Sequence, residues 1–172
     1  MSGLFVRLLG EDGFARLPAA VQRLHQGGTF TGEAEVGGPE GFVARVVGWL
    51  VGFPAPAAAV PVRVTIEQDA DGEVWIRDFG GRRFRSRMAI GAAGLEERFG
   101  PFAFRVAVPA DDTGLRVVVR GWRVFGIPLP LALAPLGDAV ESEDAAGRFR
   151  FDVAVGLPLG MGQVVRYRGW LV

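Results

Sequence analysis

The sequence predicts a mainly β protein in which an antiparallel sheet follows a short helical region. From Val60 onward apolar and polar residues alternate, as in half-buried strands. Short turns separate these strands, whereas parallel neighbours need a long crossover. Helical spacings are confined to the first third of the chain. We therefore expect one domain over residues 1–172, with a helical segment and first strand at 1–54 and an antiparallel β-meander at 55–172.

The N-terminal segment combines helices with one strand. An apolar stripe at three- and four-residue spacing consists of Phe14, Leu17, Val21, Leu24 and His25. Pro18 begins a second short helix, because proline suits a first helical position. Gly27-Gly28 ends it. A strand is expected at residues 29–36, and a second apolar helix at residues 40–51.

The helix at residues 40–51 carries bulky apolar side chains on more than one face. Such a helix is usually buried. It could instead form a lid over an apolar cavity or lie in a membrane interface. Interfacial helices generally carry a strongly basic polar face, which argues against the last alternative.

The remaining chain contains most of the sheet. Strands are predicted at residues 60–67, 73–79, 83–90, 95–99, 102–108, 115–122, 139–143, 148–155 and 163–172. The proline-rich stretch from Gly126 to Pro135 cannot be a central strand. About nine or ten strands must curl, close or split. We expect a curled meander or an incomplete or closed β-barrel, with two to three N-terminal helices covering one face; a two-layer sheet with helices on one face is the alternative.

Composition disfavours several classes of function. Nineteen basic residues, all arginine, balance nineteen acidic residues, which argues against a nucleic-acid partner. No cysteine is present, and a single histidine cannot form a multi-histidine metal site. No glycine-rich phosphate motif occurs, so no cofactor is expected. Arg7 interrupts the N-terminal apolar run, and no run is long enough to span a bilayer. We expect a cytoplasmic protein without stable membrane insertion.

His25 is the first candidate functional residue. It lies at the end of the apolar helical stripe, where a histidine can cap free carbonyl groups, and we favour this structural interpretation. The alternative is a general base or a hydrogen-bond donor to a ligand at a pocket rim.

Three arginines form the second candidate group. Arg83, Arg85 and Arg87 share one strand face and could bind a carboxylate or phosphate. We favour a solvated outer face on which Glu96 and Glu97 of the next strand are the cross-strand partners.

Further candidates come from the second half of the chain. Glu141 and Glu143 share a strand face and could exchange protons if that face points inward. The tripeptide Arg-Gly-Trp occurs at residues 120–122 and 168–170, where each glycine is expected to mark a bend or a close approach and each tryptophan to pack nearby. A cation–π wall for a ligand is the alternative. The candidate ligand-binding residues are His25, Arg83, Arg85, Arg120, Trp122, Glu141, Glu143, Tyr167, Arg168 and Trp170.

The order of several motifs resembles a bacterial family. The motifs are Leu24-His25-x-Gly27, Arg98-Phe99-Gly100-Pro101-Phe102, Arg120-Gly121-Trp122 followed by Ile127-Pro128-Leu129-Pro130, Arg148-Phe149-x-Phe151-Asp152-Val153, and Tyr167-Arg168-Gly169-Trp170-Leu171. Together they resemble the family catalogued as domain of unknown function 4166. The resemblance implies domains that occur alone or follow nicotinamide-dependent, saccharopine-dehydrogenase-like or short-chain-reductase-like domains, and it assigns no catalytic residue.

Three functions remain open at this point. The first is a non-enzymatic module that binds a small apolar or anionic ligand in a cavity of the curled sheet. The second is an enzyme that performs acid–base chemistry there with His25, Glu141 or Glu143, and Tyr167. The third is an accessory domain that docks on a separate reductase through an exposed apolar patch. We favour the first.

Overall fold

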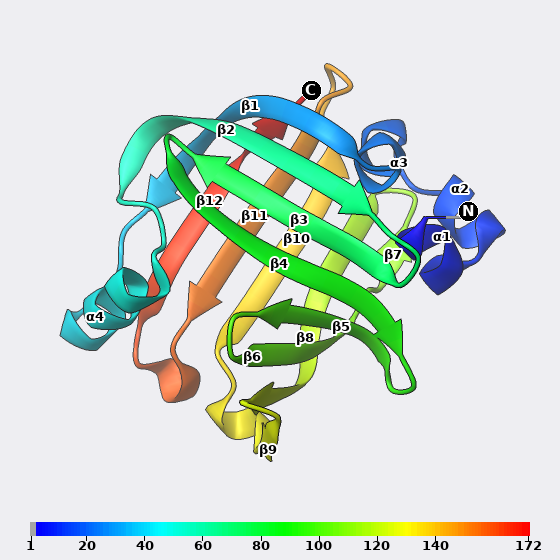
Figure 1. The fold of residues 1–172 in the computed structure, drawn as a ribbon. Coiled ribbons are helices and arrows are strands. Elements are labelled where there is room, and N and C mark those ends of the chain that lie inside the picture. The colour runs from blue at the N-terminus through cyan, green and yellow to red at the C-terminus, as the bar shows by residue number, and fades with distance from the viewer. Residues whose placement is uncertain (1–2) are drawn as a thin grey trace.

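The strands of this protein form a closed antiparallel β-barrel, as Figure 1 shows in a computed structural model that describes residues 3–172. The helices are α1 (Leu4–Leu9), α2 (Glu11–Ala15), α3 (Ala19–His25) and α4 (Phe42–Val51), with short 3₁₀ turns η1 (Leu131–Leu133) and η2 (Pro158–Gly160). The strands are β1 (Gly28–Gly37), β2 (Ala57–Gln68), β3 (Gly72–Phe79), β4 (Arg82–Gly91), β5 (Gly94–Phe99), β6 (Phe102–Ala107), β7 (Ala110–Asp111), β8 (Gly114–Val124), β9 (Ile127–Leu129), β10 (Leu136–Glu143), β11 (Phe149–Gly156) and β12 (Gln163–Leu171).

Ten strands make the barrel, in the order β10-β11-β12-β1-β2-β3-β4-β5-β6-β8. Pairing of β8 with β10 closes the ring, for example at Val117 opposite Ala139. The short strands β7 and β9 pair only with β8 and lie outside the ring. The prediction of a curled antiparallel meander is confirmed, and the sheet closes completely.

Strand alternation decides which side chains enter the barrel. On β2, Val62, Val64 and Ile66 are buried, whereas Arg63 and Glu67 are exposed on the outer face. This arrangement follows from the two-residue period of a strand. The prolines at 128, 130 and 135 lie outside the central strands, as expected from their missing backbone donors.

The helices lie at the two ends of the barrel (Figure 1). The segment α1–α3 covers one end, where Leu4, Phe5 and Leu24 are fully buried within the main core. Helix α4 lies at the opposite end, near η1, η2 and β9, and packs against β12. We call the first the closed end and the second the mouth.

The prediction that the apolar helix at residues 40–51 is buried is wrong. Ala44 is its one buried residue, and it contacts a small separate core with Leu157 and Val164. The outer side of α4 is exposed: Phe42 and Trp49 are 76% and 75% accessible. A helix can be apolar all round and still contribute only one face to packing. Within residues 3–172, no helix has the length and hydropathy needed to cross a bilayer.

Candidate functional site: the barrel interior

The barrel encloses a cavity of about 400 Å³. At the closed end its lining includes Phe5, Leu24 and Leu171, and at the mouth it includes Phe53 and Trp122. The cavity therefore extends along the barrel between the plug formed by α1–α3 and the mouth. Its volume lies within the range typical of small-molecule sites.

On one side of the cavity, the inward-facing side chains are not fully covered by other side chains. Val117 and Val119 of β8 and Val153 and Val155 of β11 point inward but are only half-buried. The inward residues of β2 on the other side are buried. Small side chains on the first wall, including Ala139, leave the interior unfilled. This apolar surface is available to a ligand.

A polar cluster interrupts the apolar wall on β3, β4 and β5. The Arg77 Nη1 donates a hydrogen bond of 2.8 Å to the Ser86 hydroxyl, and Nη2 lies 3.6 Å from a Glu97 carboxylate oxygen. The Arg77 guanidinium also lies 4.8 Å from the Trp75 ring centroid. Arginine stacks well on aromatic rings while keeping its donors in the plane. Arg77 and Glu97 thus provide polar groups, held in place by these contacts, on the wall of an otherwise apolar cavity.

Tyr167 of β12 also lines the cavity and is buried, between the rings of Phe79 and Phe151. Burial raises the pKa of Tyr167 to about 12, with nearby Arg77 opposing the shift. The phenol therefore keeps its proton at neutral pH. Tyr167 can donate a hydrogen bond, but it cannot serve as a resting base.

His25 and Glu141 form a pair at the closed end. The Nε2 of His25 lies 2.7 Å from Glu141 Oε2, and the imidazole packs against the Phe5 ring, tilted by 31°, with centroids 3.6 Å apart. His25 Nδ1 is buried with no partner among residues 3–172. An unprotonated Nδ1 fits this apolar contact better than an N–H would, which favours the tautomer in which Nε2–H donates a hydrogen bond to Glu141. The predicted helix-capping role of His25 is wrong, because its ring reaches a carboxylate on β10.

Glu141 is the member of this pair that faces the cavity. His25 holds one carboxylate oxygen and thereby orients the side chain. The pair brings together two of the candidate residues, 116 positions apart in sequence. Glu143, on the same strand face, instead accepts a hydrogen bond from the backbone N–H of Ala20 at the start of α3. Its role is to attach that helix to β10.

Glu73 lies beside this pair and is fully buried. It accepts hydrogen bonds from the Trp75 indole, the Gln68 amide and the backbone N–H of Leu4. Burial raises the pKa of Glu73, and these bonds together with the nearby His25 oppose the shift. Glu73 thus connects α1 to two barrel strands. Its contacts are structural, because the donors surround both oxygens.

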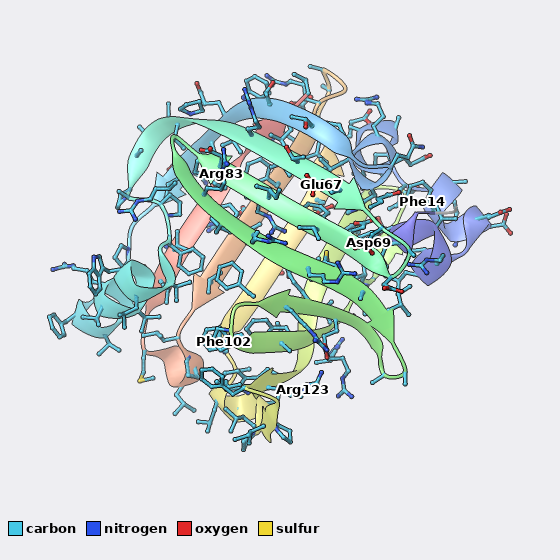
Figure 2. The ribbon with its side chains drawn as sticks, viewed as in Figure 1. Phe14, Glu67, Asp69, Arg83, Phe102 and Arg123 are labelled. Atoms are coloured by element: carbon cyan, nitrogen blue, oxygen red, sulfur yellow. The ribbon has the colours of Figure 1, made fainter. Side chains whose placement is uncertain are left out.

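The other candidate residues are divided between the cavity and the outer face. Trp122 lines the cavity at the mouth, stacks on Phe104 and donates to the Pro130 carbonyl. The candidates outside the cavity are Arg83, Arg85, Arg120, Arg168 and Trp170. Figure 2 shows Arg83 on the outer side of the near strands. Arg168 pairs with Glu35, and Trp170 stacks under the guanidinium of Arg148.

The expected partners of the arginine row are wrong. Arg83 pairs with Asp78 and Arg87 with Asp69, both from β3 or its preceding turn rather than from β5. Glu96 instead pairs with Arg98 and Arg123 on the outer face. Glu97 points inward to Arg77. One residue along a strand reverses the face, so two adjacent glutamates cannot share the same partners.

Arg77 and Glu97 are the interior polar residues that sequence analysis missed. The signal was present in the alternation. Arg77 shares a face with Trp75 and Phe79 on β3, and Glu97 shares one with Leu95 and Phe99 on β5. A charged residue of opposite sign on the apolar face of each of two strands, here β3 and β5 on either side of β4, indicates an ion pair on the inner face.

The fold and the cavity define a closed antiparallel β-barrel with an apolar interior site and a few fixed polar groups. The chain belongs to the family described as Domain of unknown function (DUF4166), whose model matches residues 17–171. Comparison with curated proteins and with solved structures returned no match. The family match confirms the resemblance inferred from the motifs.

Proposed function

We propose that this protein binds a small, largely apolar ligand inside its barrel. The observation that carries the proposal is the cavity of about 400 Å³. The valines that line one side of it are only half-buried, so their apolar surface is not covered by other protein side chains. Burial of apolar ligand surface stabilises a complex by roughly 25 cal/mol per Å² before the costs of association. A barrel that served only as a scaffold would gain stability by filling this space.

The polar groups of the cavity support an amphiphilic ligand. The Tyr167 hydroxyl donates, the Glu141 carboxylate accepts, and Arg77 offers a cation already partly compensated by Glu97. A hydroxyl or carbonyl group on an otherwise apolar ligand matches these groups. A free anion matches less well, because Glu97 and Glu141 both face the same chamber.

Native mass spectrometry of freshly purified protein and fluorescence titration with N-phenyl-1-naphthylamine test the proposal. We expect a co-purified small molecule, or a saturable one-to-one complex with the uncharged probe. A protein that carries no ligand and does not bind the probe would contradict the proposal.

Ala139→Phe should close the site. Ala139 points inward on β10 between Val117 and Val153, so a benzyl group there occupies the cavity. We expect probe affinity to fall by about tenfold or more, with little loss of stability because the side chain enters existing space. The control is Ala89→Phe on the outer face of β4, beside the inward-facing Met88. Equal probe affinity in both variants would place the probe outside the barrel.

A second candidate function is acid–base catalysis at Glu141. The observation that favours it is the 2.7 Å contact with His25, which orients a carboxylate toward a largely apolar cavity. Glu141→Gln keeps the shape but removes the base, and Ala139→Phe removes the substrate space. If the site is catalytic, turnover of a bound ligand followed by mass spectrometry will stop in Glu141→Gln while probe binding persists. Persistent turnover in that variant would exclude Glu141 as the base.

A further inference from the structure

Exposed apolar side chains gather around the mouth of the barrel. Three segments form what we call the mouth rim: residues 42–53, 125–136 and 157–162. Of the large hydrophobic side chains that are exposed within residues 3–172, all but Ile90 and Val172 belong to these segments. Figure 1 shows α4, β9, η1 and η2 at this end of the barrel. The exposed apolar surface is therefore concentrated at the mouth end of the barrel, where the cavity is lined by Phe53 and Trp122.

The rim segments also contact one another. η1 packs against η2, and Ala44 of α4 packs with Leu157 beside η2. The backbone N–H of Glu40, just before α4, donates to the carbonyl of Gln163, just after the third segment. The three segments thus form one continuous border and not three unrelated loops.

Helix α4 presents two different apolar faces. Ala44, Val47, Gly48 and Val51 face the barrel, where Gly48 lies next to Val164. Phe42, Val46, Trp49 and their neighbours form the opposite face at three- and four-residue spacing and are exposed. An exposed aromatic stripe on a helix costs solubility unless something covers it.

Two bulky rim residues are held in a strained backbone conformation. Phe125 and Leu159 have φ of 48° and 58°, and within residues 3–172 they are the residues other than glycine with positive φ. Their side chains are 82% and 74% exposed, so they gain little from packing. Glycine or asparagine would fit this backbone with less strain. Strain kept at an exposed apolar position indicates that the side chain is presented for contact.

The rim offers almost no polar group to a partner. Across its three segments Arg45 is the one charged residue, and no Ser, Thr, Asn, Gln, Asp or Glu occurs. A protein interface typically makes about one hydrogen bond per 100–200 Å², which these side chains cannot supply. Insertion of apolar side chains into a lipid surface does not require hydrogen bonds from those side chains. Since a single arginine provides little attraction to anionic headgroups, the surface that fits is uncharged overall.

We infer that the mouth rim docks this protein on a zwitterionic phospholipid bilayer, with the cavity opening toward the lipid. The exposed face of α4 and the tips at Phe125 and Leu159 enter the interfacial layer, while the barrel stays in water. Exchange of an apolar ligand between bilayer and cavity rests on the proposed function; the docking itself does not. An apolar ligand then passes between the two without crossing water.

Sedimentation with phosphatidylcholine vesicles tests the inference on the full chain. We expect the protein to pellet with vesicles equally at about 0.05 M and about 0.5 M NaCl, because apolar contact is not screened. Trp49 fluorescence should shift to the blue on binding, and the shift should be lost in Trp49→Phe. Binding that requires anionic lipid or disappears at high salt would overturn the inference.

Phe125→Asn combined with Leu159→Asn separates docking from folding. Asparagine tolerates the left-handed backbone, so the melting temperature should stay the same or rise. Vesicle affinity should fall by about tenfold or more, since two apolar anchors are removed. Ile90→Ser combined with Val172→Ser removes the exposed apolar residues that lie away from the rim, and this control should bind vesicles normally. Equal losses in both double variants would contradict a role of the rim.

Two further outcomes distinguish the alternatives. A dimer in vesicle-free buffer that Trp49→Ser dissociates would make a second copy the occupant of the rim and overturn the inference. Probe binding in solution should persist in the Phe125 and Leu159 variant, whereas Ala139→Phe should still pellet with vesicles. Failure of the cavity proposal and failure of the docking proposal therefore give different results.

Discussion

Gly169→Ala is expected to lower the free energy of unfolding by about 3 kcal/mol or more. Gly169 of β12 lies opposite Ala34 of β1, and a Cβ at this position would be 2.2 Å from the carbonyl oxygen of Glu33. That oxygen belongs to the backbone of the neighbouring strand, so no rotamer change relieves the clash. Gly32 meets the same strand pair from the other side, where a Cβ would be 1.8 Å from the Trp170 carbonyl oxygen. The backbones of β1 and β12 therefore approach too closely at both positions to admit a side chain.

Urea denaturation of the wild-type protein and of Gly169→Ala measures the difference in the free energy of unfolding. The control is Gly137→Ala, a strand glycine whose added Cβ would meet only the Val119 side chain, at 3.4 Å. We expect that variant to change stability by about 1 kcal/mol or less. A loss in Gly169→Ala no larger than that in Gly137→Ala would contradict the close approach of β1 and β12 as its cause.

Glu73→Ala is expected to cost about 3 kcal/mol. The substitution leaves the Trp75 indole and the Leu4 N–H without their acceptor at a fully buried position, whereas the Gln68 amide keeps the His25 carbonyl as an acceptor. It also leaves a void between α1 and the barrel. Thermal and urea unfolding measure the loss. Fraying of α1 should accompany it, seen as faster amide exchange near Leu4.

Glu73→Gln separates the charge of this residue from its shape. Burial raises the pKa of the folded-state carboxyl above its ordinary value of 4.5, so the folded protein holds this proton more tightly than the unfolded chain. The stability linked to Glu73 is fully present below pH 4.5 and is lost as pH rises through the folded-state pKa. Relative to wild type, Glu73→Gln should therefore gain stability as pH rises through this window. A constant difference between the two proteins across the window would contradict the raised pKa. The Gln68 amide can rotate to accept from the new NH₂ group, so we expect this variant to fold.

Much of the sheet was predictable because local rules act on neighbouring residues. The hairpin between β3 and β4 follows from Gly80-Gly81, both of which have positive φ. Alternation on β2 correctly separated Val62, Val64 and Ile66 from the outer face. The close approach expected at Gly169 is confirmed, and Gly121 lies at the irregularity between β6 and β8. This irregularity shifts the alternation, so Trp122 faces the cavity while Trp170 stays outside.

The candidate site was only partly predictable. His25 and Glu141 were both named, but nothing local places a helix end at residue 25 against a strand at residue 141. Arg77 and Glu97 were missed because alternation was followed for apolar residues and not for charges. Arg83, Arg85 and Arg87 were predicted as candidates because they form a row on one strand face. In the structure, Arg83 and Arg87 are paired with nearby aspartates on the outer face. In the sequence, a charge in an exposed row and a single charge on the inner face look alike until the inner face of the sheet is known.

The sequence by itself determined most of the strands, their turns and the alternation of inner and outer residues along strands such as β2. Only the tertiary structure decided that β8 pairs with β10, that the inner face encloses a cavity, and that α1–α3 and α4 occupy opposite ends. The physical reason is the separation along the chain of the residues that interact. Turn chemistry and alternation depend on residues a few positions apart, whereas closure of a barrel depends on the register summed over all its strands.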